Sequence, residues 1–341
     1  MFGPTLQHAS HHNRPWQPSP GTDNGGPSTR AIPVLDLGFW SDAPDQGVQR
    51  PTALDPAALL PETRREADND YMTQDLEADF EPAALLDRIT VATDYLITTI
   101  DGLGDDDMRT PSLLPDWTRG HVLTHLARNA DGGTRLLTWA RTGEPAQEYP
   151  SLTARAAQIE AGADRATAER IADVRTSAEG FVTAYSRMPA EAWRHIVQWA
   201  TGQEHPAARI ADARLCEVLV HHVDLQVGFT PDDWPADFVA YELDILTTAI
   251  NHRENSPPLR LHATDTDARY DISDGTNTPV IRGRQASLLA WLMGRSAGTD
   301  LAIDNGTIDD DIATLHGMGP NAIKTQRQAL QKHRLSFRTG A

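Results

Sequence analysis

The sequence predicts a bundle of four α-helices followed by a small domain of mixed α/β structure. Between about residues 82 and 227, long segments repeat apolar residues every three or four positions, the period of an amphipathic helix. From about residue 259 onward, short strand-like runs are separated by a turn signal. The 341 residues are enough for two domains that each have their own core.

The N-terminal region is expected to be disordered over residues 1–71. It is rich in Pro, Gly, Ser, Asp and Asn, and its apolar residues show no sustained period. Met72 begins the patterned part of the chain, so we expect it to be the true start of translation. A mass spectrum of the native protein that showed the longer form would contradict this expectation.

The helical domain is expected to span residues 72–229. Thr118 follows a break at Pro115 and Asp116 and is a suitable N-cap for the second helix. The connections are long for a simple up-and-down bundle, so we expect irregular crossings. The four predicted helices cover residues 82–103, 117–141, 164–188 and 208–227.

The second domain is expected to span residues 236–305. Residues 230–235 are predicted to form a hinge before it, with Trp234 buried between the domains. Asp274 and Gly275 form a turn signal between the second and third predicted strands. The predicted helices cover residues 236–252 and 285–295, and the predicted strands cover 259–264, 268–273, 279–282 and 300–303. Residues 306–341 are interpreted as a divergent tail, basic over residues 325–338.

The fourth predicted helix carries charge within a largely apolar surface. Apolar residues surround most of its circumference, so we expect it to be buried. A polar stripe nevertheless runs along it, with spacings that place its members on one face: Arg214, Glu217, His221 and Asp224. Unpaired buried charge costs roughly several kcal/mol, so this stripe needs a partner. A divalent cation would satisfy a carboxylate and an imidazole together.

A third ligand for such a cation is available on the second predicted helix. His125 lies within the apolar stripe of that helix, whereas His121 lies one turn earlier, towards its polar edge. We therefore predict a divalent metal, zinc in the first instance, held by His125, Glu217 and His221. Three protein ligands plus water form an open, catalytic type of site, because a structural zinc is usually closed by four protein ligands.

Other interpretations of these residues stay open. Glu217 and His221 could satisfy each other as an intrahelical pair, and E-x-x-x-H is a short pattern with many chance matches. His222 points about 100° away on the helix, so we interpret it as a packing residue or as a support for the ligands. Cys216 is interpreted as a small buried residue rather than a nucleophile.

Four motifs occur in an order that resembles the mycothiol-dependent maleylpyruvate isomerase family. They are W-T-R-G-H-V-L-T-H-L-A-R-N-A-D at residues 117–131, E-V-L-V-H-H-V-D-L at 217–225, T-P-D-D-W-P at 230–235 and L-A-W-L-M-G-R at 289–295. The resemblance covers roughly residues 76–304. It implies a DinB-like metal-binding bundle, followed by a small sheet with helices similar to sterol-carrier folds. It also implies His125, Glu217 and His221 as the metal ligands and mycothiol as a thiol cosubstrate.

The resemblance further implies the reaction and some supporting roles. The mycothiol thiolate would add to the cis double bond of maleylpyruvate, and rotation followed by loss of the thiolate would leave the trans isomer. Arg295 is implied to reach the active site as a catalytic residue, where it could bind a carboxylate or a developing enolate. An ion pair between the domains is the alternative role for Arg295. Asp224 could orient His221 or His222, and Arg214 could neutralise Asp224 or Glu217.

Two other functions stay open at this point. The same site could serve a mycothiol S-transferase that acts on an electrophile, or a protein that binds metal or a small ligand without catalysis. The formal charge of −18 argues against nucleic acid and anionic membranes as partners. The sequence contains no apolar run long enough to span a membrane and no signal-peptide pattern, and its single cysteine suits a reducing cytosol. We therefore expect a cytoplasmic protein with a small-molecule substrate.

Overall fold

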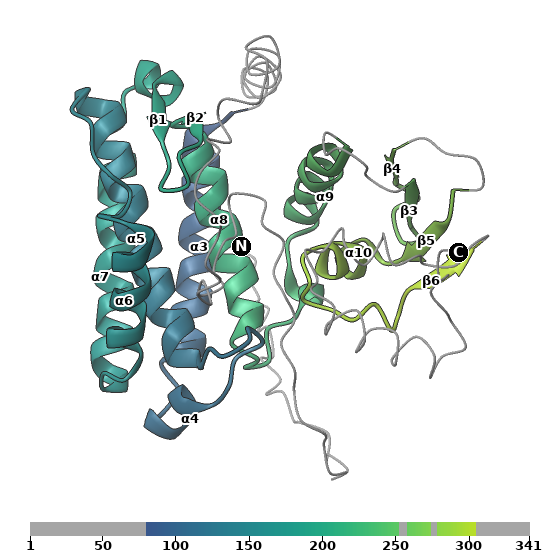
Figure 1. The fold of residues 1–341 in the computed structure, drawn as a ribbon, viewed down its shortest axis with the longest axis horizontal. Coiled ribbons are helices and arrows are strands. Elements are labelled where there is room, and N and C mark those ends of the chain that lie inside the picture. The colour runs from purple at the N-terminus through teal and green to yellow at the C-terminus, as the bar shows by residue number, and fades with distance from the viewer. Residues whose placement is uncertain (1–79, 252–257, 274–277, 305–341) are drawn as a thin grey trace, which may run out of the picture.

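The computed structural model describes residues 80–251, 258–273 and 278–304 (Figure 1). The expected disorder of residues 1–71, the start at Met72 and the tail at 306–341 lie outside these residues. Four long helices run side by side in the N-terminal part: α3 (Pro82–Ile100), α5 (Arg119–Thr142), α7 (Thr167–Ser186) and α8 (Arg209–Asp224). Helices α3 and α5 each contact both α7 and α8, so the four helices enclose a shared core.

The starts of these helices follow the local sequence. Pro82 opens α3 at a position where a missing N–H costs nothing. Thr118 is the N-cap of α5, as predicted, and its backbone N–H donates to Nδ1 of His121 at 3.1 Å. Gly143, with φ of 77°, ends α5 in the left-handed conformation that suits glycine.

The structure also contains elements that the periodicity did not predict. Helix α6 (Leu152–Ala163) packs along α5. The short helix α4 (Asp105–Arg109) precedes α5 in the chain. A hairpin of β1 (Ile196–Gln198) and β2 (Glu204–Pro206) follows the short 3₁₀ helix η2 (Ala190–Arg194). Ser151 caps α6, since its Oγ accepts the N–H of Ala154 at 3.0 Å. Because α6 is alanine-rich and buries Ile159 as its one large side chain, it shows little amphipathic period.

The C-terminal region is a small mixed sheet with two helices. It contains α9 (Ala236–Asn251), β3 (Leu259–Ala263), β4 (Arg269–Ile272), β5 (Val280–Gly283), α10 (Gln285–Leu292) and β6 (Ala302–Asp304). The strand order is β4-β3-β5-β6, with β3 and β5 parallel and the other pairs antiparallel. The predicted turn at residues 274–275 lies outside the described residues. Strands β4 and β5 lie on opposite sides of β3 and are not paired with each other.

The two regions are joined through a buried tryptophan. The segment between α8 and α9 forms a short 3₁₀ turn, η3 (Pro231–Asp233), and Trp234 follows it with 5% of its surface exposed. Trp234 Nε1 donates to the carbonyl of Leu219 on α8 at 3.0 Å. The predicted burial of Trp234 is therefore confirmed, and the buried apolar residues of both regions form one continuous cluster. In the described ranges, no helix is both long and apolar enough to cross a membrane.

Candidate metal centre

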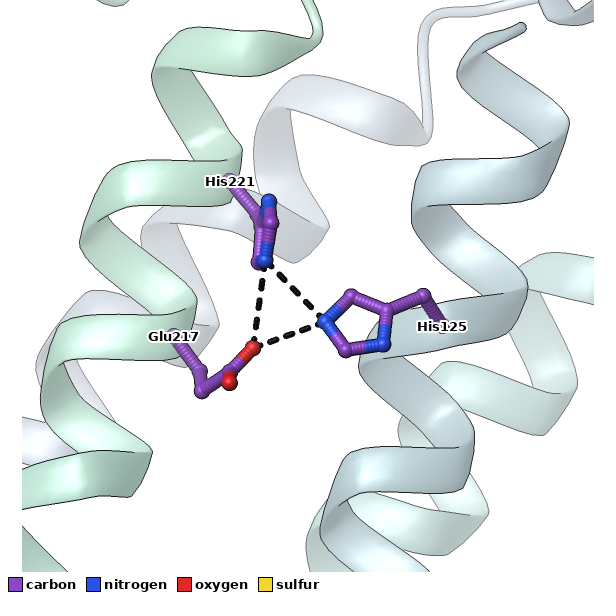
Figure 2. Close-up of side chains that lie close together, drawn as sticks. All are labelled: His125, Glu217 and His221. Atoms are coloured by element: carbon purple, nitrogen blue, oxygen red, sulfur yellow. Dashed lines mark hydrogen bonds and ion pairs between the residues drawn. The ribbon is translucent and has the colours of Figure 1, made fainter. Parts of the chain in front are cut away.

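Helices α5 and α8 bring His125, Glu217 and His221 together, as Figure 2 shows. His125 Nε2 lies 2.8 Å from Glu217 Oε2 and 3.0 Å from His221 Nε2, and the remaining side of the triangle measures 3.2 Å. All three side chains are buried. The predicted proximity of these residues is confirmed, and their role as metal ligands stays a prediction.

The triad is buried because α8 is buried on nearly all sides, including the face that carries its charged residues. Its buried residues include apolar side chains and also Arg214, Glu217, His221 and Asp224. Glu217 and His221 are one turn apart and therefore face the same side of the helix. His125 meets them from the facing surface of α5, within the apolar stripe predicted for that helix.

The three ligand atoms suit a small divalent cation. Zinc binds such atoms at about 2.0–2.1 Å, which places tetrahedral ligands about 3.3 Å from one another. The observed separations of 2.8–3.2 Å are slightly shorter, so a shift of a few tenths of an ångström at each side chain would accommodate the ion. Two imidazoles and one carboxylate also match the donor atoms that zinc prefers.

Asp224 fixes the orientation and the tautomer of His221. Its Oδ2 lies 2.7 Å from Nδ1 of His221, so this nitrogen carries the proton and Nε2 presents a lone pair to the triad. Arg295 holds Asp224 from the C-terminal region, with Nε donating to Oδ1 at 3.1 Å and Nη2 donating to Oδ2 at 2.9 Å. Of the two histidines that Asp224 was predicted to orient, the structure therefore selects His221.

Arg295 reaches the centre through Asp224 in this structure. Its remaining guanidinium nitrogen, Nη1, donates to the carbonyl of Met293 at 2.9 Å. The residue is thus an ion-pair partner between the two regions, which was the alternative interpretation of its role. Direct contact with a substrate stays a prediction. Asp224 is neutralised by Arg295 and not by Arg214, which donates instead to Leu126 and Asn129.

The groups around Glu217 and Asp224 favour the ionised form of both carboxylates. Burial opposes the ionisation of Glu217, but the adjacent His125 and His221 outweigh it and hold its pKa below the usual range. Burial likewise opposes the ionisation of Asp224, and Arg295 together with His221 outweighs it, so its pKa is also lowered. Both carboxylates are therefore negative at neutral pH, as a cation site requires.

The remaining candidate residues lie outside the triad. His121 contacts Thr118 and lies 3.2 Å from Glu160, which confirms its place at the polar edge of α5. His222 stacks on Phe229, with ring centroids 4.0 Å apart, and is a packing residue. Cys216 is buried, and burial raises the pKa of its thiol well above the ordinary value, so it is not poised as a nucleophile.

Sequence reasoning missed Arg155, which contacts the triad from α6. Its Nη2 lies 2.9 Å from Nδ1 of His125. It also missed the residues of a cavity of about 60 Å³ beside Glu217, among them Glu148, Tyr149 and Trp199. The N-cap serine at the start of α6 was the one local signal that could have revealed the helix that carries Arg155.

Comparisons with known proteins cover most of the described chain. The family model described as the mycothiol maleylpyruvate isomerase N-terminal domain matches residues 89–226, and the model for the C-terminal domain of that family matches residues 233–311. No curated protein matched the sequence.

Two solved structures are similar to this chain over nearly their full length. A crystal structure of the mycothiol-dependent maleylpyruvate isomerase has 26% sequence identity and a TM-score of 0.62, and the match covers 67% of this chain and 95% of that one. A histidine-to-alanine mutant of that enzyme has 24% identity, a TM-score of 0.63 and the same coverage. The likeness to the mutant shows the shared fold.

Proposed function

The chain belongs to the mycothiol-dependent maleylpyruvate isomerase family and is an isomerase, and on this premise we propose that it converts maleylpyruvate to fumarylpyruvate with mycothiol and a divalent metal. The observation that carries the proposal is the buried triad of His125, Glu217 and His221, whose ligand atoms converge beside a cavity. We propose zinc as the metal. We also propose that residues 72–229 form a DinB-like four-helix bundle and that residues 236–305 form a sterol-carrier-like domain.

The proposed reaction needs a thiolate and an electron-withdrawing substrate. When bound by His125, Glu217 and His221, a divalent cation would lower the pKa of a coordinated thiol or water. The mycothiol thiolate adds to one carbon of the cis double bond, and the displaced electron pair moves onto the conjugated carbonyl. The former double bond then rotates as a single bond. Return of the electron pair expels the thiolate and leaves the trans isomer, so the thiol is regenerated.

The residues of the chain have supporting roles in this proposal. Asp224 keeps the proton of His221 on Nδ1, which leaves Nε2 available as a ligand. Arg295 keeps Asp224 ionised and oriented. We therefore propose that Arg295 acts mainly as a positioning residue, through Asp224 and His221.

The first experiment follows maleylpyruvate in the ultraviolet with zinc-loaded protein, with and without mycothiol. We expect conversion to fumarylpyruvate only when mycothiol is present. If folded, zinc-bound protein gives no thiol-dependent conversion, the proposal is wrong, and transfer of mycothiol to another electrophile becomes the function to test.

A matched pair of histidine variants tests the metal centre. We expect His125→Ala to lose most zinc binding and the thiol-dependent turnover together, because it removes one of the three ligands. His121→Ala, one turn away on the same helix, should keep both. Turnover that survived in zinc-free His125→Ala would contradict a catalytic role for the metal.

A further inference from the structure

The cavity beside the triad is lined by residues from several elements. It has a volume of about 60 Å³, and its polar lining includes Asn129, Glu148, Arg155, Arg214 and Glu217. Since one water needs about 10–15 Å³, this space has room for a few non-hydrogen atoms. Glu217 belongs both to the cavity and to the triad, so a group bound in the cavity lies next to the candidate metal centre.

Arg214, which lines this cavity, has a buried donor without a partner among the described residues. The side chain is 2% exposed, and Nη1 donates to the carbonyl of Leu126 at 3.0 Å and to Oδ1 of Asn129 at 2.8 Å. Its Nη2 is buried and has no hydrogen-bond partner within the described part of the chain. A buried charged donor without an acceptor is costly, so this atom indicates an acceptor that the described residues do not provide.

The surroundings hold the Arg214 guanidinium in place as a cation. Its central carbon lies 5.9 Å from the centroid of the Phe181 ring. Burial lowers the pKa of Arg214 to about 10, which still leaves it charged at neutral pH. Glu217, one turn along α8, does not use its Oε2 for Arg214, because this oxygen faces His125 and His221 at 2.8 and 3.2 Å.

A second guanidinium lines the same cavity. Arg155 lies over the ring of Tyr149, with its central carbon 5.4 Å from the centroid, and contacts His125. Besides Glu217, the carboxyl group of Glu148 lines the cavity, but its Oε2 accepts the N–H of Ala200 at 2.8 Å, and burial raises its pKa. The cavity therefore combines two guanidinium cations with the ionised Glu217, whose Oε2 is directed at His125 and His221, and with a second carboxyl group, Glu148, that is less readily ionised than usual.

We propose that this cavity is a carboxylate-binding subsite, in which Arg214 Nη2 and the Arg155 guanidinium bind one end of a dicarboxylate substrate. The identity of the substrate rests on the proposed function. Maleylpyruvate is a dicarboxylate, whereas mycothiol carries no carboxylate, so the subsite distinguishes the acid from the thiol. A guanidinium suits this role because it offers paired donors to a carboxylate.

Binding of succinate, measured by isothermal titration calorimetry, tests the subsite directly. Succinate is a saturated dicarboxylate and cannot be isomerised, and succinamide provides the uncharged control. The titrations use the full-length protein in metal-free and zinc-loaded form, so that binding to the metal is separated from binding to the arginines. We expect metal-free protein to bind succinate but not succinamide.

Three variants test whether Arg214 donates to the bound carboxylate. Arg214→Met should weaken succinate binding by at least about tenfold, since a hydrogen bond to a charged group is lost, and Arg214→Lys should weaken it less. Arg209→Met is the matched control, because Arg209 is also a buried arginine on α8 but does not line the cavity. It should bind succinate like the unaltered protein. Circular dichroism confirms that each variant is folded.

Equal succinate affinity in folded Arg214→Met and the unaltered protein would overturn the proposal, and so would an unaltered protein that binds no succinate. In steady-state assays, Arg214→Met should raise KM for maleylpyruvate at least about tenfold and leave KM for mycothiol unchanged. If maleylpyruvate is not a substrate but succinate binding still depends on Arg214, the subsite stands and the proposed function fails. The two conclusions are therefore distinguishable.

Discussion

Glu242 on α9 is a carboxyl group whose neighbours do not compensate its burial. It is 7% exposed, and burial raises its pKa to about 7, against opposing contributions from the Cys216 thiol and from Arg209. Between the ordinary value of 4.5 and about 7, the folded protein keeps this proton while the unfolded chain has lost it. Because the folded state binds more protons, the contribution of Glu242 to stability decreases as the pH rises through this interval.

We expect Glu242→Gln to remove this dependence. The amide resembles the protonated carboxyl group, so the gain in unfolding free energy over the unaltered protein should increase from pH 4.5 to 7 and then level off. At about 1.4 kcal/mol per pKa unit, the gain should reach up to about 3.5 kcal/mol. Urea unfolding across this pH range measures it, with exposed Glu179→Gln as the control of equal charge change. A gain in unfolding free energy that did not change with pH would contradict the raised pKa of Glu242.

At the scale of elements, α6 depends on a close approach to α5. A Cβ added at Gly162 would clash with Cγ2 of the buried Thr124. We expect Gly162→Ala to destabilise the protein by about 1–3 kcal/mol, because the β-branched neighbour cannot move aside without repacking. It should also displace Arg155, which α6 carries.

Gly180→Ala is the matched control on α7, where an added Cβ meets nothing within 4 Å. There, alanine should stabilise the protein by about 0.5–1 kcal/mol, through helix propensity alone. Chemical denaturation of both variants provides the comparison. Equal effects of the two substitutions would show that the approach of α6 to α5 is not tightly packed.

At the scale of the whole molecule, Arg295 and Asp224 connect the C-terminal region to the metal centre. The side chains of both residues are buried. Arg295→Met leaves the Asp224 charge unpaired, which should cost about 3–5 kcal/mol of stability. Because Asp224 also orients His221, we expect zinc affinity to fall by about 10–100-fold. Denaturation and competition with a zinc chelator measure the two effects.

Arg284→Met is the control for this prediction. Arg284 pairs with Asp232 at 2.8 Å, but both side chains are more than half exposed. Its loss should cost less than about 1 kcal/mol and leave zinc affinity unchanged. If Arg295→Met behaved like this control, Arg295 would have no positioning role.

Local patterns in the sequence were sufficient for the main elements and for the centre of the site. The apolar period placed the long helices within a few residues of their observed bounds, because burial of one face requires that spacing. The charged stripe of α8 predicted Glu217 and His221 as neighbours for the same reason. His125 was selected because it lies within an apolar stripe.

Contacts between distant segments required the tertiary structure. The pairing of Asp224 with Arg295 joins residues 71 positions apart, and no local spacing distinguishes Arg295 from Arg214 as the partner. Helix α6 was missed because it lies on α5 through glycine and alanine, which leave little hydrophobic period. Arg155 and the cavity were missed with it. The sequence by itself determined the four long helices and the residues of the triad, since these depend on the period of single elements, whereas the tertiary structure alone decided which charges meet around the triad.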